Sequence, residues 1–134
     1  MTATVTYLGD LRTECTHLKS GNAFITDAPT DNQGKGEAFS PTDTVATGLG
    51  ACMITVMGIK ARDLEVSLDG SRVEVTKHMA ASPRRISRID VTLHLPERVS
   101  DKNRKILENT GRTCPVAMSL HPDIEQVVEF RWTM

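Results

Sequence analysis

The stretch that decides the fold is SPTDTVATGLGACMITVMGIKAR, residues 40–62. It opens with a helix-start signal, because Ser40 can cap the first turn, Pro41 suits the first helical position and Asp43 can reach back as a variant capping box. Apolar side chains then point in nearly every direction around the axis, which predicts a long helix that ends near Arg62. We expect this helix to have little solvent-facing side and to form the buried centre of the fold.

Three glycines interrupt this predicted helix, at Gly48, Gly50 and Gly58. Each glycine costs about 1 kcal/mol relative to alanine in a helix interior. Their presence predicts that something packs very close to the helix axis. A second helix from a partner subunit would fit, and an apolar cylinder of this length is hard to cover within 134 residues. We therefore expect a homodimer.

The rest of the chain alternates between short strands and helices. Period-two patterns and turn residues predict three strands before the central helix and two after it. They are Thr2–Leu8, Leu11–Leu18, Ala23–Thr26, Arg72–Met79 and Ile86–Leu95, with a loop over Asp27–Gly36. A helix from Ser100-Asp101 to near Gly111, a short helix over Cys114–Leu120 and a strand over Val127–Trp132 follow. The order β-β-β-α-β-β-α-α-β predicts an α+β fold, in a single domain over residues 1–134.

The composition of the chain excludes some classes of function. The chain has 134 residues, 39% hydrophobic and 25% charged, and a formal net charge of -1. Because there is no excess positive charge to attract phosphates, we expect no nucleic-acid partner. No uninterrupted apolar run approaches the roughly 18 residues of a membrane span, and Met1 to Asp10 does not resemble a leader. The sequence therefore predicts a cytoplasmic protein with no membrane partner.

The three cysteines are the candidate reactive groups. They are too few and too scattered for a disulfide framework. Cys52 lies mid-helix among apolar residues, where burial would raise the pKa of its thiol and leave it inert. Cys114 stands at the cap position before Pro115, where first-turn amides and the helix dipole favour a thiolate. Cys15, in a predicted strand, is most simply structural.

Two motifs carry a family resemblance. The segment Phe39–Cys52 reads FSPTDTVATGLGAC, and Cys114–Leu120, whose cysteine follows Cys52 by 62 positions, reads CPVAMSL. Together they resemble the OsmC/Ohr family of osmotically inducible and organic hydroperoxide resistance proteins. The resemblance extends over essentially the whole chain. It implies an intertwined homodimer with two long helices at the centre, antiparallel sheets on the flanks and two sites at the subunit interface.

The same resemblance implies a thiol-dependent peroxidase acting on organic hydroperoxides. Cys52 would be the peroxidatic thiolate and Cys114 the resolving thiol. A dithiol reductant, such as a lipoylated protein, or a small thiol would reset the pair. The resemblance implies no cofactor, and the histidines at 17, 78, 94 and 121 show no metal-ligand spacing.

The charged groups depart from the family pattern. Family peroxidases hold the thiolate with an arginine from the N-terminal half and a glutamate near the helix-start proline. Thr42 stands at the glutamate position, so Asp43 is the available carboxylate. Arg12 is the nearest counterpart of the arginine, and Lys35 is a weaker one. Three further arginines lie at the start of a predicted strand: Arg84, Arg85 and Arg88. They form either a charged turn and an exposed strand face, or a functional cation. Such a cation would contact an anion or the carboxylate of a substrate, or act across the dimer.

Because the arginine and glutamate that hold the thiolate in family peroxidases are not both matched here, two further functions stay open. The first is an OsmC-like small-molecule-binding or redox-sensing protein with little peroxidase activity. The second is a purely structural dimer, which requires thiols that do not react in the native state.

Overall fold

The computed structural model describes all 134 residues, Met1 to Met134. The chain folds in the predicted element order, so the α+β prediction is confirmed. Its internal contacts form two compact units, Met1–Val45 and Ala46–Met134, which we describe separately. Helix α1 (Pro41–Asp63) runs through the boundary between them. The single-domain expectation stays a prediction.

The first unit is built on a three-stranded antiparallel sheet of β1 (Ala3–Gly9), β2 (Arg12–His17) and β3 (Ala23–Asp27). The loop after β3 contains a short 3-10 helix, η1 (Thr30–Asn32). One sheet face carries large apolar side chains that nothing in the chain covers. Val5 is 66% exposed, Tyr7 65% and Phe24 53%. We call this the uncovered sheet face.

The second unit has a three-stranded sheet of β4 (Arg72–Ala80), β5 (Arg85–Leu95) and β6 (Glu125–Trp132). Strands β4 and β5 are antiparallel, but β6 runs parallel to β5. This differs from the expected antiparallel sheets. The reason is the crossover through α2 (Asp101–Arg112) and α3 (Pro115–Ser119), which returns the chain to the start of the sheet before β6 begins.

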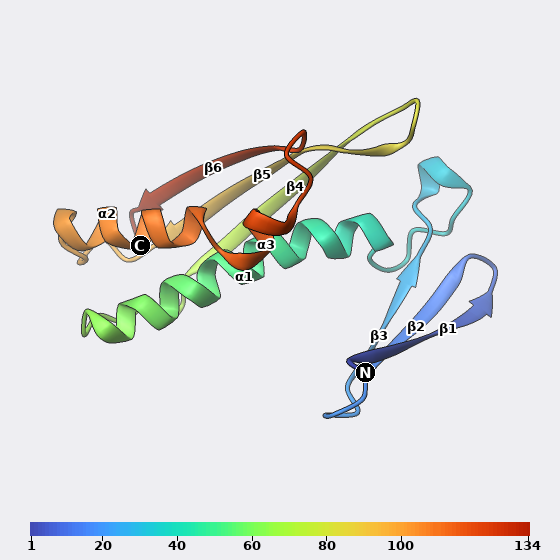
Figure 1. Cartoon of the computed structure of the whole chain (residues 1–134), viewed down its shortest axis with the longest axis horizontal. Helices are drawn as coiled ribbons and strands as arrows, with labels where there is room; N and C mark the ends of the chain where they lie inside the picture. Colours follow the sequence, from blue (N-terminus) through green and yellow to red (C-terminus); the bar gives the residue numbers. More distant parts are fainter. The chain divides into compact units, whose positions relative to one another are not determined.

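The core of this unit lies between one sheet face and the helices (Figure 1). Strand β5 alternates in the way that a half-buried strand requires, with buried apolar residues on one face and Asp90 and His94 on the other. The largest fully buried apolar side chains are contributed by α1, β5 and α2: Leu49, Met53, Met57, Ile89, Val91, Leu93, Leu95 and Leu107. Helix α3 adds buried Ala117, and its cap residue Cys114 is also buried, so all three helices contribute to this core.

Helix α1 is buried along one side only. Within a single chain its other side is open, and Ile59 is 60% exposed. The sequence predicted that this face would be covered by a partner subunit, and within one chain no other element covers it. The close approach predicted from the glycines occurs at Gly50, where a Cβ would lie 2.7 Å from a Val75 methyl of β4. At Gly48 and Gly58 nothing lies within 4 Å of that position.

Helix α1 is also long and apolar enough to cross a membrane, with a mean hydropathy of 1.4 over an 18-residue window. The sequence contains no uninterrupted apolar run of this length, and the helix reaches this hydropathy with glycine and threonine interspersed among its apolar residues. A single helix of this kind is weak evidence for a membrane, since the core helix of a globular protein has the same composition.

Candidate functional site

The second unit brings Cys52 and Cys114 together. Cys52 lies on α1 and is half-buried, whereas Cys114 is 1% exposed at the N-cap of α3. Cys52 lies close enough to Cys114 to be one of the groups that raise the pKa of the Cys114 thiol. The Cys114 sulfur also accepts a hydrogen bond from the Ala117 amide at 3.4 Å. Both thiols are free. The two sequence motifs had singled out both residues, and the catalytic roles that the resemblance implies for them stay predictions.

Burial raises the pKa of the Cys114 thiol, and interaction with Cys52 raises it further. The amides of Ala117 and Val116 act in the opposite direction but are weaker than desolvation. The cap amides therefore act in the direction that the sequence indicates, but burial outweighs them and the net pKa of Cys114 is raised.

In the first unit, Arg12 is held by acidic side chains. Its guanidinium donates two hydrogen bonds to the carboxylate of Asp27, at 2.7 and 2.8 Å, and Glu37 lies 3.8 Å away. Asp27 is 1% exposed. The hydrogen bonds from Arg12 hold the pKa of Asp27 below its usual range, with a smaller contribution from the charge of Lys35.

Sequence analysis missed Asp27 and Glu37 as partners of Arg12, although one signal was available. Arg12 and Asp27 are directly opposite across the antiparallel β2–β3 pair. Extending the register of the two predicted strands by one residue would have placed opposite charges face to face. Glu37 has no such signal, because its position depends on the path of the loop.

Asp43 closes the capping box expected at the start of α1. Its carboxylate accepts a hydrogen bond from the Ser40 amide at 2.9 Å, and the Ser40 hydroxyl accepts one from the Asp43 amide at 3.0 Å. This geometry gives Asp43 a structural role. Its catalytic role stays a prediction.

The remaining candidates take part in local interactions. Arg85 donates to the carbonyls of Ala81 and Pro83 in its own turn, and Arg88 pairs with Asp90 at 2.5 Å. The charged-turn interpretation therefore accounts for these two arginines. Cys15 is half-buried in β2. No group of three or more His, Cys, Asp or Glu side chains is arranged to hold a metal ion.

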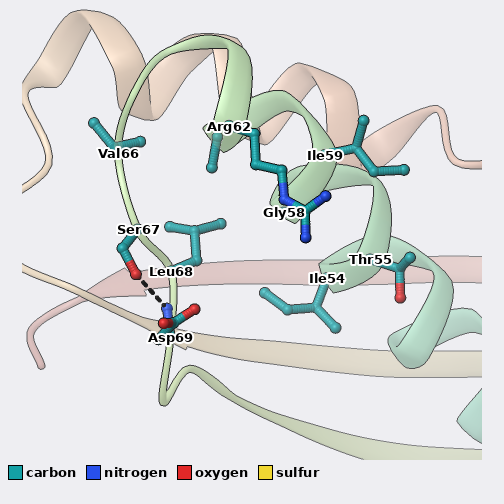
Figure 2. Close-up of a pocket in the computed structure, with 10 residues that line it drawn as sticks. Ile54, Thr55, Gly58, Ile59, Arg62, Val66, Ser67, Leu68 and Asp69 are labelled. Carbon is teal, nitrogen blue, oxygen red and sulfur yellow. Dashed lines mark hydrogen bonds between the residues drawn. The ribbon is translucent and has the colours of Figure 1, made fainter.

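A cavity of about 460 Å³ lies at the C-terminal end of α1 (Figure 2). Its walls are mostly apolar, with polar groups from Thr55, Arg62, Ser67 and Asp69. The Ser67 hydroxyl accepts a hydrogen bond from the Asp69 amide at 3.1 Å, which fixes the loop that closes the cavity. None of the predicted site residues lines it.

Comparison with known proteins identifies the family. The sequence profile described as OsmC-like protein matches residues 34–129, which include both Cys52 and Cys114. The chain belongs to the OsmC-like family. The resemblance found in the two cysteine motifs is thereby confirmed. No protein with a curated functional description matches the sequence.

Solved structures agree with this membership. The OsmC-like chain is 56% identical to a protein from Psychrobacter arcticus 273-4, provisionally described as an osmotic stress induced and detoxification response protein. That match has a TM-score of 0.94 and covers 98% of this chain and 96% of the other. An organic hydroperoxide resistance protein OsmC from Legionella pneumophila matches at 15% identity and a TM-score of 0.77, over 98% and 97% of the chains. The organic hydroperoxide resistance protein OhrB of Bacillus subtilis matches at 16% identity, TM-score 0.69, over 98% of both chains. These last two show a shared fold.

Proposed function

We propose that this OsmC-like protein is a thiol-dependent peroxidase that reduces organic hydroperoxides through Cys52 and Cys114. The observation that carries the proposal is the pairing of two free thiols from distant parts of the sequence, one on α1 and one at the cap of α3. Structural thiols have no need of such a pairing. A peroxidase that forms an internal disulfide requires it.

The burial of the two sulfurs supports one assignment of roles. A peroxide must touch the sulfur that it oxidises, and Cys52 is the more accessible of the pair. Cys114 is fully buried, and its raised pKa keeps it protonated while Cys52 reacts. Cys52 is therefore the peroxidatic residue and Cys114 the resolving residue. Arg12 and Asp43, which belong to the first unit, are the charged groups that the family resemblance assigns to supporting the thiolate, and these roles stay predictions.

The proposed reaction balances in two steps. The Cys52 thiolate attacks one oxygen of the peroxide, the O–O bond breaks, and the alkoxide takes a proton and leaves as an alcohol. Cys52 is then a sulfenic acid. The Cys114 sulfur attacks the Cys52 sulfur, forming a disulfide and releasing water. A dithiol restores both thiols by exchange and is itself oxidised to a disulfide.

The surroundings of Cys52 favour an alkyl peroxide over hydrogen peroxide. Cys52 is half-buried and packs against the apolar core. An alkyl group gains free energy when it leaves water for such surroundings, by about 0.8 kcal/mol for each buried methylene. The reaction also needs reduced thiols, which suits the cytoplasm.

The test is peptide mapping after one equivalent of tert-butyl hydroperoxide, with free thiols trapped before unfolding. We expect a loss of two hydrogens that maps to a Cys52–Cys114 crosslink within seconds. Cys52→Ser should abolish peroxide consumption, and Cys114→Ser should leave a sulfenic acid that oxidises further. Cys15→Ser is the matched control and should behave like the wild type. Persistence of both thiols and of the peroxide would refute the proposal.

The proposal includes a homodimer. Two apolar surfaces lack cover within one chain: the uncovered sheet face and the open side of α1, where Ile59 is exposed and Gly48 and Gly58 have no neighbours. Burying both against a second copy would remove them from water. Sedimentation equilibrium should give twice the chain mass of 14.7 kDa, and Ile59→Glu should shift it toward the monomer. A monomeric wild-type mass at micromolar concentration would contradict this part.

A second candidate function is ligand binding or redox sensing with little turnover. The observation that favours it is the engagement of Arg12 by Asp27 and of Asp43 by Ser40. Charges held in structural pairs are less available to stabilise a thiolate. Slow peroxide decay that does not depend on a dithiol, combined with tight binding of an apolar ligand, would favour this function.

A further inference from the structure

We infer that Gln126 is a positioning residue for the resolving thiol, an inference that rests on the proposed function. Its side-chain amide donates a hydrogen bond to the Ala117 carbonyl at 3.0 Å. Ala117 is the residue whose own amide donates to the Cys114 sulfur at 3.4 Å. Gln126 thus holds the same peptide segment that holds the sulfur, from the neighbouring strand β6.

The location of Gln126 is unusual for a polar side chain. It is half-buried on β6, on the same face as Val128 and Phe130, which pack against the core. The other core-facing residues of β6 and its partner on β5, Ile89, are apolar, so a glutamine here costs free energy unless it is hydrogen-bonded. The bond to α3 is the partner that satisfies it.

Helix α3 has only five residues, so the carbonyls of its last turn depend on partners outside the helix. The Cys114 carbonyl accepts from the Met118 amide, the Val116 carbonyl from the Leu120 amide and the Pro115 carbonyl from the Ser119 hydroxyl. Gln126 supplies the donor for Ala117. It is the side chain that ties the polar backbone of α3 to the sheet.

The consequence concerns the second chemical step and leaves the first step unchanged. Peroxide attack takes place on Cys52, which is on α1 and does not depend on α3. Disulfide formation requires the Cys114 sulfur to stay directed at Cys52, which does depend on how α3 is held. Loss of the Gln126 bond should slow disulfide formation about five- to tenfold, the factor that one lost hydrogen bond corresponds to.

The experiment separates the two steps by trapping. Each protein is mixed with tert-butyl hydroperoxide and a fixed excess of dimedone, which captures sulfenic acids. The ratio of dimedone adduct on Cys52 to Cys52–Cys114 disulfide is then measured by mass spectrometry. Gln126→Met removes the donor and keeps the side-chain length. Gln126→Glu keeps the shape and replaces the donor with an acceptor. Glu125→Gln, on the opposite sheet face, is the matched control.

We expect both Gln126 variants to raise the adduct-to-disulfide ratio about five- to tenfold while peroxide consumption in the first turnover stays unchanged. The control should match the wild type. A wild-type ratio in Gln126→Glu or Gln126→Met would overturn the inference, and so would an equal slowing of both steps. If the wild type forms no disulfide, the proposed function itself fails, which is a distinguishable result.

Discussion

Replacement of Gly50 by alanine tests whether the contact between α1 and β4 sets the position of the reactive helix. Gly50 lies two residues before Cys52, on the buried side of α1. A Cβ at this position would lie 2.7 Å from Cγ2 of Val75 and 3.1 Å from Cγ1 of Val73. Both distances are shorter than an ordinary carbon contact, so something must move.

Two opposing terms set the size of the effect. Alanine gains about 1 kcal/mol over glycine in a helix interior. Overpacking costs about 1–3 kcal/mol. The upper part of that range applies here, because valine side chains are stiff at χ1 and Val75 is paired with Val91 in the sheet. We expect a net loss of about 1–2 kcal/mol, or a fall in Tm of about 3 to 8 °C.

Urea and thermal unfolding of Gly50→Ala and the wild type, at several protein concentrations, measure this loss. The control is Ala51→Gly, the reverse change at the exposed neighbouring position, which should cost about 1 kcal/mol through helix propensity alone. If Gly50→Ala is as stable as the wild type, or more so, the close contact with β4 does not limit the packing of α1 and the reasoning fails.

Three further predictions concern individual contacts. Ser40→Ala removes the hydroxyl that caps α1 and should lower the free energy of unfolding by about 1 kcal/mol, measured with urea. Asp27→Asn should lower the free energy of unfolding at pH 7. Because the pKa of Asp27 is lowered in the folded state, the difference in stability between variant and wild type should persist above about pH 4 and shrink as the pH falls further. A difference that instead grows in acid would contradict the Arg12–Asp27 pair. Trp132→Phe removes the 2.9 Å indole hydrogen bond to Glu108 and should cost about 1–3 kcal/mol in the same urea assay.

Most of the fold could be predicted from the sequence because its elements carry local signals. The box at Ser40 and Asp43 and the cap at Ser100 place two helix starts correctly. The direction of β6 could not be predicted in this way, since period-two alternation is the same in parallel and antiparallel strands. The open side of α1 was anticipated from its all-round apolar pattern, but such a pattern cannot show what covers that side.

The candidate site could be predicted only in part from the sequence. The two cysteine motifs led to the Cys52–Cys114 pair, but the burial of each sulfur depends on the packing of α3, which no local pattern encodes. Gln126 was missed because the predicted strand began at Val127, whereas β6 begins at Glu125. A glutamine that lies just before a strand carries no indication that its side chain is hydrogen-bonded. A half-buried glutamine on the core face of a strand, in contrast, needs a hydrogen-bond partner.

The influence of Cys52 on the pKa of Cys114 bears on the order of the two proposed steps, and it can be measured. The charge of Cys52 is one of the causes that raise the pKa of Cys114, after desolvation. Oxidation of the Cys52 thiolate to a sulfenic acid removes that charge, so the pKa of Cys114 falls when its nucleophilic form is needed. Cys52→Ser removes the same charge without oxidation. The pH dependence of Cys114 alkylation, followed by peptide mapping, should therefore shift to lower pH in this variant and still lie above that of an exposed cysteine, because burial remains. An unchanged midpoint would show that the two sulfurs do not communicate by charge, and the order of the steps would then rest on accessibility alone.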